Sequence, residues 1–226
     1  MSSQIIVKKQ LVERTISGLH DNLLQSLPQL SSDIPVLDIG CGTGAWLERL
    51  SFVGFKHLHG IDLDVQQFGA EGATCSQANL DYDDLGFGNR KFGLITAIEV
   101  IEHLENPGRI LYHVARHLDN NGYFLLTTPN IHSVSCRLKF LITGKLASFD
   151  EKGDPTHIYP VLLSCLNRVL PRYSLKIVKQ WGYPATGSLI FCHNTRIISR
   201  VLELFISSNG LNGDTLCMLI QKANNS

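Results

Sequence analysis

The sequence predicts an α/β fold organised around a doubly wound, largely parallel β-sheet. From residue 35 onward, short runs rich in Val, Ile and Leu alternate with amphipathic segments, and a glycine closes several of them. Strands that alternate with helices are joined by right-handed crossovers, which leave helices on both faces of the sheet. The 226 residues, 44% hydrophobic and 18% charged, suffice for one domain with a sizeable core.

The leading segment, residues 4–30, is expected to be a helix that ends near Pro28. Its apolar side chains recur at alternating intervals of three and four residues, which is the period of one helix face. These side chains are Val12, Ile16, Leu19, Leu23, Leu27 and Leu30.

The next hundred residues show the alternation of strands and helices most clearly. The runs PVLDIG (35–40) and KFGLITAIEV (91–100) are short and apolar, as in strands that are buried on both faces. Further strands are expected at 56–64, 73–80 and 123–130, and helices at 42–54, 65–72 and 103–122.

The pattern becomes less regular after residue 130. Residues 131–160 mix apolar residues with Gly, Asp and Pro, which predicts an irregular insertion that contains one helix. Two helices and two strands are expected beyond it, at 160–170 and 194–208 and at 173–183 and 214–223.

Composition narrows the class of protein. The 20 Lys plus Arg balance the 20 Asp plus Glu, whereas proteins that bind long nucleic acids usually carry a basic excess. The six cysteines form no C-x-x-C pair and no cluster with zinc-ligand spacing, which suits a reducing compartment. The first 15 residues contain too few consecutive apolar residues for a signal peptide, and no run of 18 apolar residues occurs. We therefore expect a soluble, cytoplasmic protein with no membrane span.

A glycine-rich turn follows the first expected strand, in VLDIGCGTG (36–44). Gly40, Gly42 and Gly44 would let the backbone approach a ligand closely, and the next helix would direct its N-terminal amides at that ligand. Asp62 lies at the end of the second strand, where a carboxylate can accept hydrogen bonds from both hydroxyls of a ribose. This order of elements predicts a ligand that contains a nucleoside.

The chemistry of the turn favours one nucleoside in particular. Dinucleotides are bound by the pattern GxGxxG, with a pyrophosphate at the helix N-terminus. Here the glycines follow GxGxG, and the preceding Asp38 would repel a pyrophosphate but could hold an ammonium group. S-adenosylmethionine fits this combination because it carries an amine, a sulfonium and a ribose.

Five segments of the chain resemble the successive motifs of class I S-adenosylmethionine-dependent methyltransferases. They are VLDIGCGTG, GIDLD, QANLDYDDL, FGLITAIEVIEHL and GYFLLTTPN, and together they cover roughly residues 35–130. The resemblance implies a Rossmann-like sheet of seven strands, mostly parallel with an antiparallel last strand. We expect one methyltransferase domain over residues 1–226, divided into a leading helix (1–32), a cofactor-binding half (33–130), an insertion or lid (131–160) and a substrate-side half (161–226).

The resemblance also implies roles for individual residues. The three glycines of the turn would surround the methionine part of S-adenosylmethionine, and Asp62 would take the ribose hydroxyls. Asn79 and Leu80 occupy the positions of the adenine contacts, although the family often has Asp at the position of Asn79. Independently of the resemblance, Glu99 follows the fourth strand directly and is expected to face the cofactor if it binds no metal.

The segment EVIEHL (99–104) allows three interpretations. Glu99, Glu102 and His103 are three and four residues apart, so they could face one way and bind Mg²⁺, Mn²⁺ or Zn²⁺ together with His157 from the insertion. Without a metal, His103 could act alone as a base or orient the acceptor, with His157 contributing to turnover. In the third interpretation, the acidic residues only favour a helix N-terminus.

Two branches of the methyltransferases show a similar segment followed by a later histidine. One is the ubiquinone-pathway O-methyltransferases, and the other is the enzymes that methylate the 2′-hydroxyl at the 3′ ends of small RNAs. In both branches the resemblance maps metal ligands onto the same four residues, Glu99, Glu102, His103 and His157.

Other polar residues are weaker candidates for chemistry. His113 and His117 are four residues apart on an expected helix, and an exposed face is their expected location. The acidic loop at residues 81–84 is expected to be solvated. His132 follows the TTPN segment on the acceptor side, and it is a candidate for a substrate contact.

These motifs predict an enzyme that transfers a methyl group from S-adenosylmethionine to a small-molecule acceptor, preferentially at oxygen. Quinone precursors and saccharide-like molecules are the expected acceptor classes. One alternative is RNA 2′-O-methylation, which the balanced charge disfavours. The other is a non-catalytic binding subunit, against which the intact glycine turn and Asp62 argue. An RNA groove would draw on basic residues of the insertion, Arg137, Lys139, Lys145 and Lys152.

Overall fold

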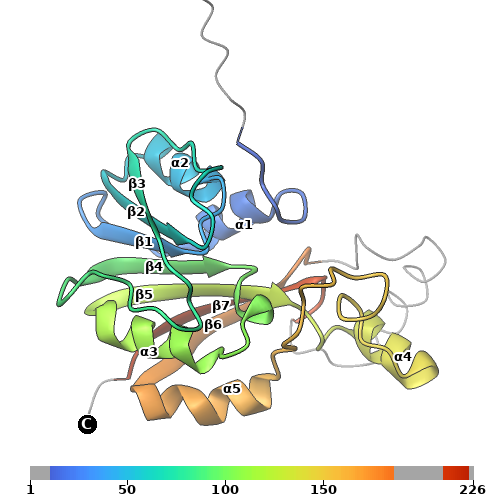
Figure 1. Cartoon of the computed structure of the whole chain (residues 1–226). Helices are drawn as coiled ribbons and strands as arrows, with labels where there is room; N and C mark the ends of the chain where they lie inside the picture. Colours follow the sequence, from blue (N-terminus) through green and yellow to red (C-terminus); the bar gives the residue numbers. More distant parts are fainter. Residues whose placement is uncertain (1–10, 186–210, 224–226) are drawn as a thin grey trace, which may run out of the picture.

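The computed structural model describes residues 11–185 and 211–223, and a seven-stranded β-sheet forms the centre of this part (Figure 1). The spatial order of the strands is β3-β2-β1-β4-β5-β7-β6. They are β1 (Pro35–Ile39), β2 (His57–Asp62), β3 (Ala73–Gln77), β4 (Phe92–Ile98), β5 (Leu118–Pro129), β6 (Leu175–Tyr183) and β7 (Thr215–Lys222).

Strand β7 is antiparallel to its neighbours, and the other strands of the sheet are parallel to one another. The pairs β1–β2, β1–β4, β2–β3 and β4–β5 are parallel, whereas β7 is antiparallel to both β5 and β6. This arrangement confirms the predicted fold class. The last strand does not lie at the edge of the sheet, because it inserts between β5 and β6.

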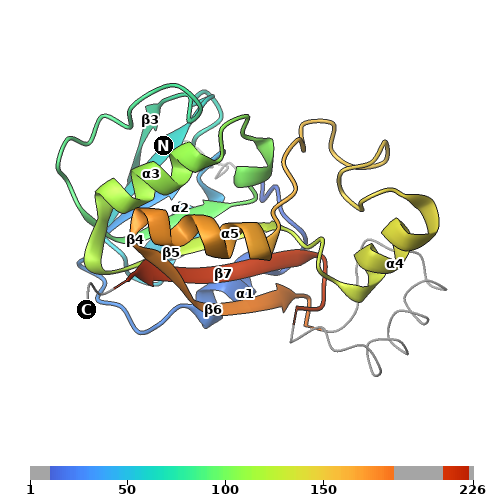
Figure 2. The same ribbon diagram turned by 90° about the horizontal axis from the view of Figure 1, so that it is seen from below.

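Helices cover both faces of the sheet. The first two, α1 (Leu19–Ser26) and α2 (Ala45–Phe52), lie on one face. The opposite face carries α3 (Gly108–His117) and α5 (Leu163–Val169), which lie in front of the sheet in Figure 2. The sheet is therefore doubly wound, as expected.

Neighbouring side chains of the central strands alternate between two cores. Val36 packs with the side of α1 and α2, whereas Leu37 packs with α3 and α5. Leu125 and Leu126 of β5 divide in the same way. Because both faces are buried, the central parts of these strands are predominantly apolar and do not alternate between apolar and polar residues.

Three further elements complete the described fold. The short 3₁₀ turns are η1 (Ile101–His103) and η2 (Leu170–Tyr173), and α4 (Val134–Thr143) is the helix expected within the insertion. In both views α4 projects beyond the carboxyl end of β5 (Figures 1 and 2). None of the helices in the described ranges is long and apolar enough to cross a membrane.

The prediction of a helix over residues 4–30 is wrong for residues 11–18, and its first part, residues 4–10, lies outside the described residues. Within the described residues the helix covers only Leu19–Ser26, and residues 11–18 form an irregular segment beside the glycine turn. The Thr43 hydroxyl anchors this segment by donating to the Val12 carbonyl oxygen at 3.0 Å. Ile16 packs into the core of α1 and α2, so its apolar character reflects tertiary packing.

The expected helix at residues 65–72 is also absent, because this stretch forms turns. The Gly69 N–H donates to the Thr43 carbonyl oxygen at 3.0 Å, so this N–H bonds to the glycine turn and not to a carbonyl oxygen of its own stretch. Phe68 packs directly against Gly44, where an added Cβ would lie 2.7 Å from the ring. Tertiary contacts therefore replace the helical hydrogen-bond pattern here.

The expected helix at residues 103–122 begins later and ends earlier than predicted. It runs from Gly108 to His117, and Leu118 already belongs to β5, where it pairs with Phe92. The sequence Asn-Asn-Gly, which has the character of a helix stop, instead lies within the first part of β5, beside a register shift in the β4–β5 pairing. The expected helix at 194–208 lies outside the described residues.

The strand order determines where a ligand can bind. Strand β1 is followed in sequence by β2 on one side, whereas β4 lies on its other side. At such a switch point, connections leave the sheet in opposite directions and open a crevice at the carboxyl ends of the strands. The glycine turn at residues 40–44 lies at this position.

Candidate functional site

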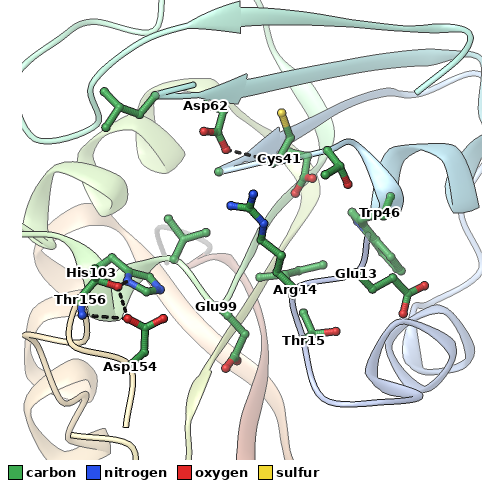
Figure 3. Close-up of a pocket in the computed structure, with 18 of the residues that line it drawn as sticks. Glu13, Arg14, Thr15, Cys41, Trp46, Asp62, Glu99, His103, Asp154 and Thr156 are labelled. Atoms are coloured by element: carbon green, nitrogen blue, oxygen red, sulfur yellow. Dashed lines mark hydrogen bonds between the residues drawn. The ribbon is translucent and has the colours of Figure 1, made fainter. Parts of the chain in front are cut away.

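A cavity of about 770 Å³ opens at the carboxyl ends of β1, β2 and β4. Its size suits a nucleoside-containing ligand with room for a small acceptor. Figure 3 shows side chains from the glycine turn, the N-terminal segment, the end of β4 and the insertion around one space. The predicted site residues that line it are Asp38, Gly40, Gly42, Asp62, Asn79, Leu80, Glu99, His103 and His157.

The three glycines of the turn have different roles. All three have positive φ values, of +74°, +51° and +84° for Gly40, Gly42 and Gly44. An added Cβ on Gly40 would meet Val100 at 2.5 Å, and one on Gly44 would meet Ala70 at 2.6 Å. Nothing lies within 4 Å of the corresponding position at Gly42, so Gly42 is the glycine that leaves room for a ligand.

Asp62 connects the end of β2 to the glycine turn. One carboxylate oxygen accepts from the Gly42 N–H at 2.7 Å, and the other accepts from the Asp64 N–H at 3.0 Å. Its carboxylate faces the cavity (Figure 3). Asp62 can therefore order the turn and still accept hydrogen bonds from a ligand, because each carboxylate oxygen has two lone pairs.

Asp38 is almost completely buried at the end of β1, with 3% of its surface exposed. The Thr96 hydroxyl donates to its carboxylate at 2.6 Å. Burial raises the pKa of Asp38 to about 7, although the hydrogen bond from Thr96 opposes the shift. A cationic ligand in the cavity would favour the ionised form of this carboxyl group.

The segment after β3 forms the wall expected to face adenine. The Asn79 side-chain oxygen accepts from the Asp81 N–H at 3.0 Å, which holds residues 79–81 in a tight turn. Leu80 lies at the cavity wall and is 8% exposed. Arg109 of α3 donates to the carbonyl oxygens of Leu80 and Asp83, so α3 supports this wall from behind.

Residues 12–16 also line the cavity, which was not predicted because the apolar spacing of this segment indicated a helix. Arg14 extends into the cavity in Figure 3 and donates to the Gln67 side-chain oxygen. Glu13 pairs with Arg49 of α2, which ties the segment to the helix after the glycine turn. Arg14 is the one arginine before the first strand in the sequence, but it belongs to no motif that would have indicated a role in the site.

Glu99 lies at the end of β4 in a backbone conformation that is uncommon for a residue other than glycine, with φ +53°. Its N–H donates to the Thr127 hydroxyl at 3.0 Å, and this hydroxyl donates to the Glu99 carboxylate at 2.8 Å. Burial raises the pKa of Glu99 to about 7, while the Thr127 hydrogen bond lowers it. The strained conformation holds this carboxyl group at the cavity wall.

Glu102, His103 and His157 lie together next to the cavity. Each offers one ligand atom, and these atoms lie within 4.8 Å of one another. The two imidazole rings are 4.7 Å apart between centroids. Glu99, the fourth predicted metal ligand, is not part of this group.

Hydrogen bonds fix the two histidine rings. The Nδ1 atom of His103 lies 2.8 Å from the Thr156 hydroxyl, which donates to Asp154 at 2.6 Å. The Nδ1 atom of His157 lies 2.9 Å from the Ser148 carbonyl oxygen. Histidines that bind metals in proteins are commonly oriented through their second nitrogen in this way. Burial lowers the pKa of His103, and the neighbouring His157 lowers it further, which favours a neutral ring.

The Glu102 carboxylate is fully buried, and neither oxygen has a hydrogen-bonding partner among the described residues. Burial and the neighbouring Glu99 raise its pKa well above the usual range. An unpaired buried carboxylate is costly unless a proton or a cation neutralises it. The donor set of one carboxylate and two imidazoles therefore fits a divalent metal ion.

Several histidines have other surroundings than expected. The prediction that His113 and His117 lie on an exposed face is wrong, because they are 1% and 0% exposed. The face of α3 that carries them packs against the loop before β4. His132 accepts from the Leu163 N–H at 3.2 Å, so it supports the start of α5.

The fold and the cavity together define a class I S-adenosylmethionine-dependent methyltransferase. A family model described as "Methyltransferase domain" matches residues 11–198. The chain belongs to this family.

Curated relatives and solved structures agree with this class. Ubiquinone biosynthesis O-methyltransferase, mitochondrial, of Candida albicans is 32% identical over 116 residues, which are 46% of this chain and 35% of that protein. Ubiquinone biosynthesis O-methyltransferase of Paraburkholderia phytofirmans is 28% identical over 132 residues, which are 55% of this chain and 56% of that protein. The matches thus span between about a third and just over half of these relatives' length.

The structural likeness extends over nearly the whole chain. An S-adenosylmethionine-dependent methyltransferase from Archaeoglobus fulgidus has a TM-score of 0.63, with 20% identity over 90% of this chain and 92% of its own. One from Mesorhizobium loti has a TM-score of 0.57, with 16% identity over 89% of this chain and 96% of its own. At these identities the likeness shows the fold alone.

Proposed function

We propose that this methyltransferase transfers a methyl group to a hydroxyl group of a small molecule. The observation that carries the proposal is the pair of oriented histidines, His103 and His157, beside the cofactor cavity. Bound S-adenosylmethionine supplies a methyl group on a sulfonium, which is already activated for displacement. The protein must therefore position the acceptor and assist the loss of its proton.

The cofactor would be held through its polar ends. Asp62 would accept from the ribose hydroxyls, and Asp38 would accept from the ammonium group. Asn79 and Leu80 would contact adenine. Arg14 would pair with the carboxylate of the methionine part, because it is a cation that extends into the same cavity.

The proposed role of Arg14 predicts a selective loss of cofactor affinity. Arg14→Met should weaken S-adenosylmethionine binding by about tenfold, since an exposed charge-assisted hydrogen bond contributes on the order of 1–2 kcal/mol. Arg14→Lys, which keeps the charge, should lose less. Calorimetric titration measures both, with Lys56→Met as the control, because Lys56 is exposed and pairs with Asp33. An unchanged Kd in Arg14→Met would reject the assignment.

Because the pKa of Asp38 is raised, we expect cofactor binding to depend on pH. With a pKa of about 7 in the free protein, affinity for the cationic ligand should rise about tenfold from pH 6 to pH 8 as the carboxyl group ionises. In the absence of ligand, the contribution of Asp38 to the free energy of unfolding changes with pH in the opposite direction, and it decreases as the pH rises. The contribution of Asp38 is fully present below its unfolded pKa near 3.8 and is lost as the pH rises through about 7.

Asp38→Asn separates this effect from the titration of Glu99, whose pKa is also about 7. The variant keeps an oxygen that can accept from Thr96 but cannot ionise, so its affinity should be lower and should lose the tenfold rise. Calorimetry at pH 6, 7 and 8 measures both proteins. The same pH dependence in Asp38→Asn would assign the titration to another group.

The acceptor would lie between the cofactor and the histidine pair. His103, with a lowered pKa, can accept a proton from an acceptor hydroxyl at neutral pH. Alternatively, Glu102, His103 and His157 would hold a divalent ion, and this ion would lower the pKa of a bound hydroxyl, so that His103 would be a ligand and not the base. Thr156 and Asp154 would orient His103 in either case.

The curated relatives are named ubiquinone biosynthesis O-methyltransferases, which supports oxygen as the accepting atom and a quinone precursor as one acceptor class. A direct test is S-adenosylhomocysteine formation with a catechol-type phenol, a saccharide with free hydroxyls, an alkyl amine and a short RNA. Turnover of a phenol or saccharide that depends on His103 would support the proposal. Turnover of the amine or the RNA alone would contradict it.

A further inference from the structure

A second group of metal-ligating side chains lies on the opposite side of the wall formed by residues 79–84. It consists of Asp84 from the loop before β4 and of His113 and His117 from α3. Each residue offers one ligand atom, and these atoms lie within 4.8 Å of one another. The group shares no residue with the cluster of Glu102, His103 and His157.

The two histidines present unused nitrogens in a buried space. They are four residues apart on α3 and therefore lie on one face of the helix. His113 is 1% exposed and its Nδ1 has no hydrogen-bonding partner in the described structure; His117 is 0% exposed and its Nε2 likewise has none. A buried polar atom without a partner costs free energy, so these two nitrogens indicate a missing ligand.

The His117 ring is held in the manner of a metal-binding histidine. The Nδ1 atom of His117 lies 3.0 Å from the Arg90 carbonyl oxygen, which leaves the Nε2 lone pair free. In His117 this contact orients Nε2 toward an ion. The His113 ring is placed differently, because its Nε2 atom lies 3.5 Å from the Arg109 guanidinium, which can only donate, while Nδ1 faces Asp84. Binding an ion through Nδ1 of His113 requires the ring proton to lie on Nε2.

Asp84 supplies the anionic ligand and access from solvent. One carboxylate oxygen lies 3.9 Å from His113 Nδ1, and the other is held by Arg116 at 3.0 Å. Its side chain is 58% exposed, so an ion and a water molecule can reach the group. Ligands on a tetrahedral zinc ion are about 3.3–3.4 Å apart, given bonds of about 2.0–2.1 Å. Closing the group to this spacing requires the exposed Asp84 side chain to rotate and the two histidine rings to adjust.

We propose that Asp84, His113 and His117 form a binding site for a transition-metal ion that prefers imidazole, with Zn²⁺ as the first candidate. Mg²⁺ and Ca²⁺ require several oxygen ligands, and the group offers one carboxylate and two imidazoles, so these ions fit it poorly. With two imidazoles, one carboxylate and a water, the site has the four ligands that zinc usually takes.

An ion at this site would hold α3 to the loop that contains residues 79–84. Arg109 of α3 already supports the carbonyl oxygens of Leu80 and Asp83. A metal ion between α3 and Asp84 would fasten the same loop to the same helix. Zinc should therefore stabilise the wall that we propose to contact adenine, although the metal site itself does not depend on the proposed function.

The test uses the full chain with the other candidate metal cluster removed, as His103→Asn with His157→Asn. This protein should bind one equivalent of Zn²⁺ or Co²⁺, measured by metal analysis after gel filtration and by the visible absorption of bound Co²⁺. Zinc at about a hundredfold excess over Kd should raise the Tm by about 5–10 °C.

Variants in the same background then identify the ligands. Asp84→Asn, at an exposed position, should fold normally and weaken Zn²⁺ binding by at least about tenfold. His117→Phe, whose ring would remain between Phe87 and Phe92, should abolish the Co²⁺ absorption. His57→Asn is the control at an exposed histidine, and it should change nothing. A background protein that binds no metal, or equal affinity in Asp84→Asn, would overturn the proposal.

Discussion

Asp62→Ala is expected to weaken S-adenosylmethionine binding by about 100-fold to 1000-fold. The carboxylate would accept from two ribose hydroxyls, and a hydrogen bond to a charged group contributes about 1.5–3 kcal/mol. The substitution also removes the acceptor for the Gly42 N–H, which Asp62 holds at 2.7 Å. The ligand would then meet a glycine turn that has lost one of its anchors. Isothermal titration calorimetry measures the change in Kd.

Two matched variants show whether this loss comes from the ribose contact. Asp64→Ala removes an exposed carboxylate two residues further along, which only accepts from the Gln66 N–H, and it should change the affinity less than about threefold. Asp62→Asn keeps one oxygen for the Gly42 N–H and should fall between the parent and Asp62→Ala. If Asp62→Ala keeps both its Tm and its Kd, the ribose assignment is wrong.

His157→Ala is expected to lower kcat by about 100-fold while cofactor affinity changes less than about threefold. The His157 ring lines the cavity with its centroid 4.7 Å from that of His103, whereas the expected cofactor contacts are on the glycine turn and β2. Removing it would leave the acceptor without one of its two oriented imidazoles. Steady-state turnover with an identified acceptor, together with calorimetry for the cofactor, separates the two effects.

The corresponding control is His57→Ala, because His57 is exposed at the start of β2 and distant in the fold from the histidine pair. This variant should retain the parent rate. A parent-like rate in His157→Ala would remove His157 from the active site.

Chelation tests the metal interpretation of the same cluster. If Glu102, His103 and His157 bind an ion, a chelator should lower the rate of the parent to the level of His157→Ala, and added Mg²⁺, Mn²⁺ or Zn²⁺ should restore it. A chelated parent that keeps full activity and contains no metal at this cluster would leave His103 as a base without an ion. Metal analysis of the Asp84→Asn variant distinguishes metal bound at this cluster from metal bound at Asp84, His113 and His117.

The sequence was sufficient for the features that depend on local order. When a short apolar strand, a glycine turn and an acidic residue at the end of the next strand follow in this order, the turn is expected at the carboxyl ends of the strands of a parallel sheet. The position of Asp62 beside Gly42 follows from that order, and the structure has them hydrogen-bonded. Strand β7 was also predicted as a strand, since its run is apolar enough to be buried on both faces.

Features that depend on contacts between distant segments were predicted less well. The apolar residues before α1 had helical spacing, yet residues 11–18 pack beside the glycine turn because Thr43 and Arg49 offer partners there. Polar character predicted an exposed face for His113 and His117, whereas the loop before β4 covers them. Local propensity carries no information about such partners.

For this protein the sequence alone determined the class of fold, the cofactor and the residues expected to hold it, because these follow from the spacing of residues along one stretch of chain. Only the tertiary structure decided which of the four residues expected to bind metal lie together. His157 belongs to the insertion, and the chain folds back so that it lies beside Glu102 and His103. The adjacent contact of His103 with Thr156 joins residues that are 53 positions apart in the sequence. Glu99 turns instead to Thr127, because its backbone adopts a positive φ at the end of β4.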